Sequence, residues 1–141
     1  MIVCLDTNVL IQARASRHAF GVLLDSFAFG LMDLAVSNRV LTEYEEMITG
    51  KAGAASWASV ARFLDLLEMS GNLISINPHF QFHVIAGDPD DNAFTDCAIA
   101  AHADYVITED RHFAPLADAG YKPQPITPQA FIERYRGVHV L

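Results

Sequence analysis

The feature that most restricts the fold is an alternation of short apolar runs with longer amphipathic stretches. Residues 2–5 form a β-branched apolar run that Asp6 ends, which is typical of a strand buried on both faces of a parallel sheet. Further runs have the length of strands, the last of them weak: residues 33–36, 73–76, 104–108 and 125–126. Because helical patterns separate these runs, we expect an α/β domain with three αβα layers and a mainly parallel central sheet of about five strands.

Helix signals fill the stretches between the predicted strands. Ser37 is placed to cap a helix over residues 38–49 that Gly50 ends, and Gly71 ends another over about 56–69. Further helices are expected from residue 7, over 18–29, over about 91–103, and from Thr127-Pro128 onward. The longest irregular stretch, residues 77–90, contains two prolines and a glycine.

Length and composition suit one globular domain over residues 1–141. A chain of 141 residues can bury roughly two thirds of its unfolded surface, and 52% hydrophobic against 18% charged residues excludes a disordered segment. We expect neither a secretory signal nor a membrane span, because no apolar run approaches about 20 residues. Cys4 and Cys97 lie in apolar sequence without metal-binding companions, so reduced core thiols and a cytoplasmic location are predicted.

The charge excludes a protein that holds nucleic acid through a broad basic surface. The formal net charge is −8, and only nine Lys and Arg residues are scattered along the chain. An acidic chain can still cleave a polyanion when divalent cations neutralise negative charge gathered in one pocket. The charge therefore favours metal ions or basic partners.

Acidic residues follow the predicted strands or lie near the starts of predicted helices. In a parallel α/β sheet the carboxyl ends of strands and the first turns of helices meet along one edge, where ligands bind. By this rule the following acids share that edge: Asp6, Glu43, Asp90, Asp91, Glu109 and Asp110. Convergent carboxylates raise one another's pKa and destabilise a fold, but Mg²⁺ or Mn²⁺ removes that cost. Such a centre activates water for phosphodiester hydrolysis.

Each acid taken singly has an ordinary explanation as a helix cap, a dipole partner or a solvated side chain. Helix residues step by about 100°, which leaves Glu43 and Glu45 at opposite borders of one apolar face, so the angle does not separate them. Asp96 faces away from Asp91 and is the weaker candidate. The joint placement of the acids favours a functional interpretation.

Four segments together resemble the PIN-domain family, particularly its short stand-alone members of the VapC-like toxin type. The segments, in order, are VCLDTNVL (3–10), SNRVLTEY (37–44), DPDDNAF (88–94) followed by Ala98, and ADYVITED (103–110) followed by Phe113. The closing segment ITPQAFI (126–132) is also similar to the last strand and helix of many members. Each segment is a weak signal alone, whereas their order and spacing are specific, and the resemblance covers nearly the whole chain.

The resemblance implies a Mg²⁺- or Mn²⁺-dependent endoribonuclease that cleaves RNA by in-line attack of water, without a covalent intermediate. It implies that the metal ligands and catalytic residues are Asp6, Glu43, Asp91 and Asp110, supported by Thr7, Asn8, Thr108 and Asp90, where Asp90 could exchange roles with Asp91. It also implies a homodimer and a small antitoxin protein as partner. The negative charge of the chain suits a basic partner.

Two other functions compete with this hypothesis. A phosphatase of the haloacid dehalogenase type also begins with a strand ending in aspartate, but Asn8 stands where it needs a second aspartate, and its lysine is hard to place. A catalytically silent PIN module that binds protein or RNA would be expected to lose some of the acids. Arg111 and His112 could meet a phosphate, although solvated loop side chains are the favoured interpretation.

Overall fold

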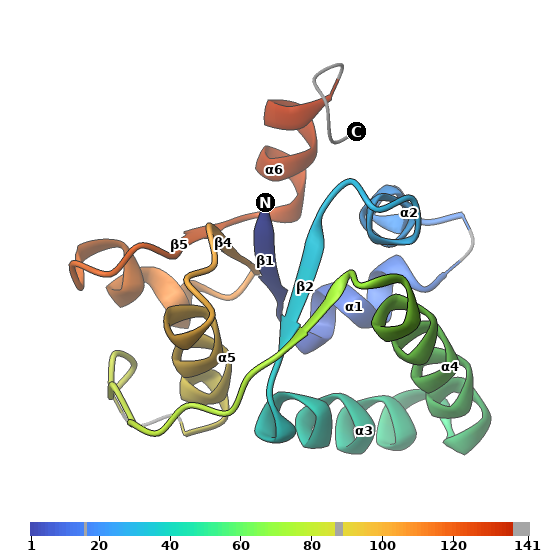
Figure 1. Ribbon diagram of the computed structural model, residues 1–141, viewed down its shortest axis with the longest axis horizontal. Coiled ribbons are helices and arrows are strands. Elements are labelled where there is room, and N and C mark those ends of the chain that lie inside the picture. Colours follow the sequence, from blue (N-terminus) through green and yellow to red (C-terminus); the bar gives the residue numbers. More distant parts are fainter. Residues whose placement is uncertain (16, 87–88, 137–141) are drawn as a thin grey trace.

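Five parallel strands form the central sheet, in the order β3-β2-β1-β4-β5 (Figure 1). The structure is a computed structural model that describes residues 1–15, 17–86 and 89–136, so Asp88 of the third motif lies outside the described residues. The strands are β1 (Ile2–Leu5), β2 (Asp33–Val36), β3 (Leu73–Ser75), β4 (Tyr105–Ile107) and β5 (Gln124–Ile126). The sheet is therefore entirely parallel, where the sequence predicted a mainly parallel one of about five strands.

Helices flank this sheet, as the α/β prediction requires. They are α1 (Thr7–Ala13), α2 (Gly21–Ala28), α3 (Asn38–Ala52), α4 (Ala54–Ser70), α5 (Pro89–Ala100), the 3₁₀ helix η1 (Arg111–Asp118) and α6 (Pro128–Tyr135). In Figure 1, α5 lies to the left of β1 and β2, and α1, α2 and α4 lie to their right. None of the helices in the described part of the chain combines the length and apolar character that a membrane span needs.

Helix ends follow local chemistry, with corrections to the prediction. Ser37 caps α3 by accepting a hydrogen bond from the Val40 amide, and Gly71 ends α4 in the left-handed conformation at φ +80°, both as predicted. Gly50 was expected to end α3 but lies inside the helix, since an interior glycine only weakens a helix by about 1 kcal/mol. The helix instead ends before Gly53, whose φ of +93° favours glycine.

The start of α2 is a second correction. The helix begins at Gly21 instead of residue 18. The Phe20 amide donates a hydrogen bond to Nδ1 of His18, at 3.1 Å. Local side-chain bonds of this kind offer the backbone an alternative to the helix.

The core includes β1, whose Val3, Cys4 and Leu5 are completely buried. The hydroxyl of the buried Tyr44 donates a 2.7 Å hydrogen bond to the Leu5 carbonyl and so ties α3 to the end of β1. Cys4 and Cys97 are buried free cysteines, as predicted, and a hydrogen bond between them together with burial raises the pKa of Cys4. Packing on β1 thus fixes the residue that follows it, which belongs to the candidate site.

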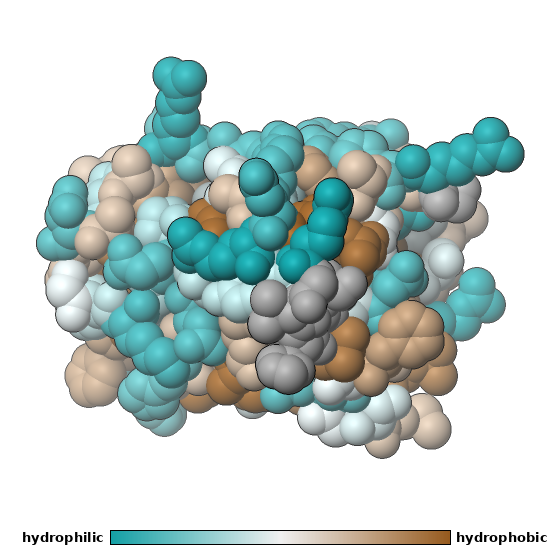
Figure 2. Space-filling view, turned by 90° about the horizontal axis from the view of Figure 1, so that it is seen from above, coloured by the Kyte–Doolittle hydropathy of each residue, from teal (hydrophilic) through white to brown (hydrophobic). Residues whose placement is uncertain are grey.

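The side of the molecule where α6 and the amino terminus of β1 lie is shown from above in Figure 2. Hydrophilic residues predominate on this side, with hydrophobic patches between them. The carboxyl end of β1, where the predicted acids gather, points away from this view.

Candidate metal centre

The sheet order places a crevice at the carboxyl ends of β1 and β4. From β1 the chain proceeds to β2 and β3 on one side, and β4 and β5 occupy the other side. Ligands of open α/β sheets bind where the strand order reverses in this way, outside the carboxyl ends of the strands. Asp6 directly follows β1, and Asp110 follows β4 by three residues.

The side chain of Asp6 is bound by the residue that follows β4. Its position is that of the N-cap of α1, but its side chain makes no capping hydrogen bond, so a helix cap does not explain this residue. Instead, its Oδ2 accepts a 2.8 Å hydrogen bond from the Thr108 hydroxyl. The same hydroxyl oxygen accepts a 3.0 Å hydrogen bond from the Asp110 amide. Thr108 therefore joins the two carboxylate-bearing segments.

Asp6 is only 7% exposed, and this burial raises the pKa of its carboxyl group above the ordinary value. The hydrogen bond from Thr108 and the Thr7 amide lower the pKa, the negative charge of Asp110 raises it, and Lys51 lowers it. Burial outweighs the contributions that lower the pKa, so the net shift is upward. A bound cation would favour the charged form instead, because it supplies the missing positive charge.

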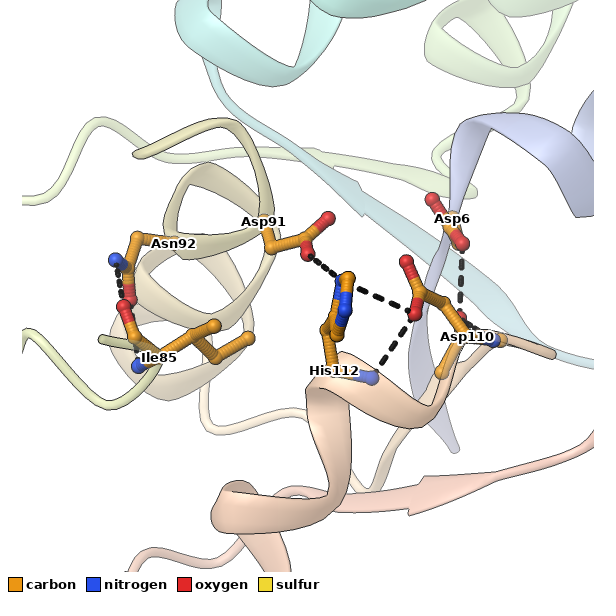
Figure 3. Close-up of polar contacts among 7 residues, drawn as sticks. Asp6, Ile85, Asp91, Asn92, Asp110 and His112 are labelled. Atoms are coloured by element: carbon orange, nitrogen blue, oxygen red, sulfur yellow. Dashed lines mark hydrogen bonds and ion pairs between the residues drawn. The ribbon is translucent and has the colours of Figure 1, made fainter. Parts of the chain in front are cut away.

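Three side chains beside Asp6 can hold a metal ion (Figure 3). One ligand atom from each of Asp91, Asp110 and His112 lies within 4.8 Å of the others. Nδ1 of His112 is 3.7 Å from Oδ2 of Asp91 and 3.4 Å from Oδ1 of Asp110, and the His112 amide donates a 2.9 Å hydrogen bond to that same Oδ1. Asp91 is buried at the start of α5, whereas the His112 side chain is 71% exposed.

The donor set fits a hard divalent cation. Two carboxylates and one imidazole face one another, and Figure 3 shows Asp6 beside Asp110. Oxygen-rich sites of this type suit Mg²⁺ or Mn²⁺. Among the residues that the structure describes, the buried Thr7 hydroxyl lacks a hydrogen-bond partner, which is a further polar group next to Asp6 for the water of a hydrated ion.

Glu43 lies on α3, outside this tight group. It is partly buried and lines a polar hollow of about 370 Å³ together with Asp90 and Glu46. Glu45 lines a different groove, between α3 and α4. The structure thus separates the two glutamates that helical angles left equivalent, because Glu43 faces the start of α5 and Glu45 does not.

The remaining predicted residues lie at the rim of the site. The side chain of Asn8 is exposed, and its Oδ1 accepts a 3.0 Å hydrogen bond from Nζ of Lys51. Asp90 is exposed, whereas Asp91 belongs to the metal-ligating group, so the two do not have equivalent environments. Lys51 brings a positive charge to the acidic edge.

From the sequence, His112 was expected to be a solvated loop residue, but its ring lies between the carboxylates of Asp91 and Asp110. The residue sits in the first turn of η1, and the sequence did not predict that helix. Asp110 caps η1 by accepting a hydrogen bond from the His112 amide, and in this turn the histidine side chain lies near Asp91. The sequence feature that could have indicated this position is a histidine two residues after an aspartate that can cap a helix.

Comparisons with known proteins agree with this architecture. Residues 2–112 match the family described as "PIN domain". No curated protein matches the sequence. Among solved structures, the chain is similar to one in the crystal structure of VapBC2 from Rickettsia felis bound to a DNA fragment from their promoter. The TM-score is 0.62 at 18% identity, over 89% of this chain and 99% of that chain, so this likeness concerns the fold.

Proposed function

Because the chain belongs to the PIN domain family, we propose that it is a metal-dependent endoribonuclease that hydrolyses phosphodiester bonds of RNA. The observation that carries the proposal is the approach of Asp91, Asp110 and His112 to within 4.8 Å of one another, beside the buried Asp6. These groups and Glu43 come from four segments that are distant in sequence. A purely structural role does not require acids to gather in this way.

In this proposal Asp6, Asp91 and Asp110 hold Mg²⁺ or Mn²⁺, and Glu43 completes the acidic wall from α3. The bound cation would polarise a phosphate oxygen and lower the pKa of a water molecule. Thr108 keeps the carboxylate of Asp6 in place through its 2.8 Å hydrogen bond. Its contact with the Asp110 amide keeps the two acids at a constant spacing.

Support for a role as the toxin of a toxin–antitoxin pair comes from the fold and the charge. The fold is similar to that of a chain of VapBC2, and the net charge of −8 would attract a small basic antitoxin. A gene for a small basic protein beside this one would support the pair. We also propose a homodimer, which sedimentation or light scattering of the purified chain would test.

Cleavage of end-labelled structured RNAs tests the proposed activity. We expect the purified chain to cut RNA with Mg²⁺ or Mn²⁺ and not with EDTA, and the Asp6→Asn and Asp91→Asn variants to lose the activity. Asp65→Asn is a matched control, because Asp65 is an exposed aspartate on α4 that lines the groove of Glu45 and not the site.

Two outcomes would contradict the proposal. Absence of cutting for every RNA, together with no thermal stabilisation by Mn²⁺, would indicate a silent binding module instead. A phosphate trapped covalently on Asp6 would indicate a phosphatase that proceeds through an aspartyl-phosphate.

A further inference from the structure

A second hollow, of about 250 Å³, lies beside the acidic edge, between the start of α3 and the loop at residues 77–82. Its lining includes amide, aromatic and charged side chains: Asn38, Arg39, Asn77, Phe80, Gln81 and Asp96. Asn38, Arg39 and Ala93 line both this hollow and the one that contains Glu43. The second hollow therefore adjoins the one that contains Glu43.

The loop that forms one wall is fixed to α5 at two places. Asp96, only 3% exposed, accepts a 3.0 Å hydrogen bond from the Phe82 amide, and its Oδ2 is 3.8 Å from Nη1 of Arg39. The side chain of Asn92 accepts from the Ile85 amide at 2.9 Å and donates to the Ile85 carbonyl at 2.6 Å. The wall is thus held by α5, the helix that carries Asp91, so the position of the wall is fixed before a ligand binds.

The aromatic ring in this wall is exposed to solvent. Phe80 is 73% exposed, and among the described residues its ring has no aromatic partner. Within the part of the chain that the structure describes, the Gln81 side chain makes no hydrogen bond and the Asn77 amino group donates none. The Asn77 carbonyl oxygen is used, because it accepts a 2.9 Å bond from the Asn38 amide.

These groups match the chemistry of an unpaired nucleobase. Proteins bind single-stranded RNA by stacking its bases on aromatic rings or guanidinium planes and by hydrogen bonding to the base edges. An exposed phenylalanine, two amides with unused donors and an arginine supply these groups within one hollow. Its volume is near the lower end of small-ligand pockets, roughly 300 Å³, which suits one base better than a longer segment.

We propose that this hollow binds one unpaired RNA base next to the bond to be cleaved, with Phe80 stacking on the base and Asn77 and Gln81 contacting its edge. The inference rests on the proposed function for the choice of RNA. The proposed contact requires an unpaired base, because a base within a duplex cannot expose its face to Phe80. Asp96 is a positioning residue that holds the loop.

Binding of a short fluorescein-labelled RNA, followed by fluorescence anisotropy, tests the inference without cleavage. All proteins in this measurement carry Asp91→Asn and are assayed with Mg²⁺, because under the proposed function that substitution prevents cleavage of the RNA. We expect Phe80→Ala to weaken binding of the single strand about 5- to 10-fold, since stacking of one base on an exposed ring lies at the low end of the measured range. Phe80→Trp should retain binding. A duplex of the same sequence should bind equally to the parent and to the Phe80→Ala variant.

The matched control is Phe29→Ala. Phe29 is 78% exposed and precedes β2, so it lies at the edge of the sheet opposite the acids. We expect this substitution to leave RNA binding unchanged. Because both side chains are exposed, both variants should keep the melting temperature of their parent. Equal effects of Phe29→Ala and Phe80→Ala, or no effect of Phe80→Ala, would overturn the inference.

Its failure is distinguishable from failure of the proposed function. If the native chain cuts RNA while Phe80→Ala changes neither affinity nor the positions of cutting, the base site is wrong and the nuclease assignment stands. If the native chain cuts no RNA but Phe80→Ala still weakens single-strand binding selectively, the hollow is a base site in a non-catalytic RNA-binding protein.

Discussion

Replacing Asp6 by asparagine should stabilise the protein at neutral pH while removing the proposed activity. Burial and the charge of Asp110 raise the pKa of Asp6, so folding makes the charged form of this side chain less favourable than it is in the unfolded chain. Asparagine is neutral, has nearly the same shape, and keeps an oxygen that can accept the hydrogen bond from Thr108. The substitution thus removes an unfavourable buried charge and leaves the packing in place.

The size of the effect follows from opposing contributions. The hydrogen bond from Thr108 to a carboxylate becomes a bond to an amide, a loss of about 1 kcal/mol. The substitution also removes the cost of desolvating the charge and its repulsion by Asp110. These costs exceed the loss, because the pKa of Asp6 is raised even though the hydrogen bond from Thr108 lowers it. We expect a net gain of about 0.5–2 kcal/mol in the free energy of unfolding, which raises the melting temperature of a domain of this length by roughly 2–8 °C.

The pH dependence has a definite sign. Below the ordinary aspartate pKa of 3.8, Asp6 is protonated in both the folded and the unfolded chain, so its charge has no effect on stability. As pH rises from 3.8 through the raised pKa of the folded state, the native protein progressively loses the stability associated with this proton. The advantage of the Asp6→Asn variant should therefore be small in acid and reach its full size at neutral pH.

Differential scanning calorimetry in EDTA, at a series of pH values, measures this advantage. Asp65→Asn is the control, since that aspartate is exposed and should give almost no change. A variant less stable than the native chain at neutral pH would refute the reasoning, as would an advantage that persists unchanged in acid.

Two further substitutions test how the site is supported. Tyr44→Phe removes the 2.7 Å hydrogen bond to the Leu5 carbonyl, and we expect a loss of about 1–3 kcal/mol in urea unfolding; no loss would mean that another donor replaces it. Asn92→Ala removes both bonds to Ile85, and we expect a loss of about 2 kcal/mol or more, with faster hydrogen exchange of the Ile85 amide than in the native chain. Unchanged exchange would show that the loop is held by other contacts.

The fold was largely predictable because the three central strands of the sheet, β2, β1 and β4, are largely buried. Strands buried on both faces, such as β1, give continuous apolar runs, and runs of this kind alternating with helices leave few topologies. Helix ends were less predictable, since they depend on backbone angles that residue type only favours. Gly50 and Gly53 both could end α3, and only the positive φ of Gly53 decides between them.

Part of the candidate site was also accessible to sequence reasoning. Helical angles predicted that Asp91 and Asp96 point to different sides of their helix. In the structure Asp91 lies in the metal-ligating group, whereas Asp96 accepts a hydrogen bond from the Phe82 amide in the loop. Tertiary contacts decided the rest. His112 approaches Asp91 only because η1 turns there, and a turn set by one capping aspartate leaves little periodic signal.

Calorimetric titration with Mn²⁺ tests the central claim, that acids from separate segments form one divalent metal site. We expect the native chain and Asp65→Asn to bind Mn²⁺ with equal affinity, and Asp91→Asn and Asp110→Asn each to bind at least about 10-fold more weakly. If the native chain binds no Mn²⁺, or if all four proteins bind it equally, these carboxylates do not form the metal centre.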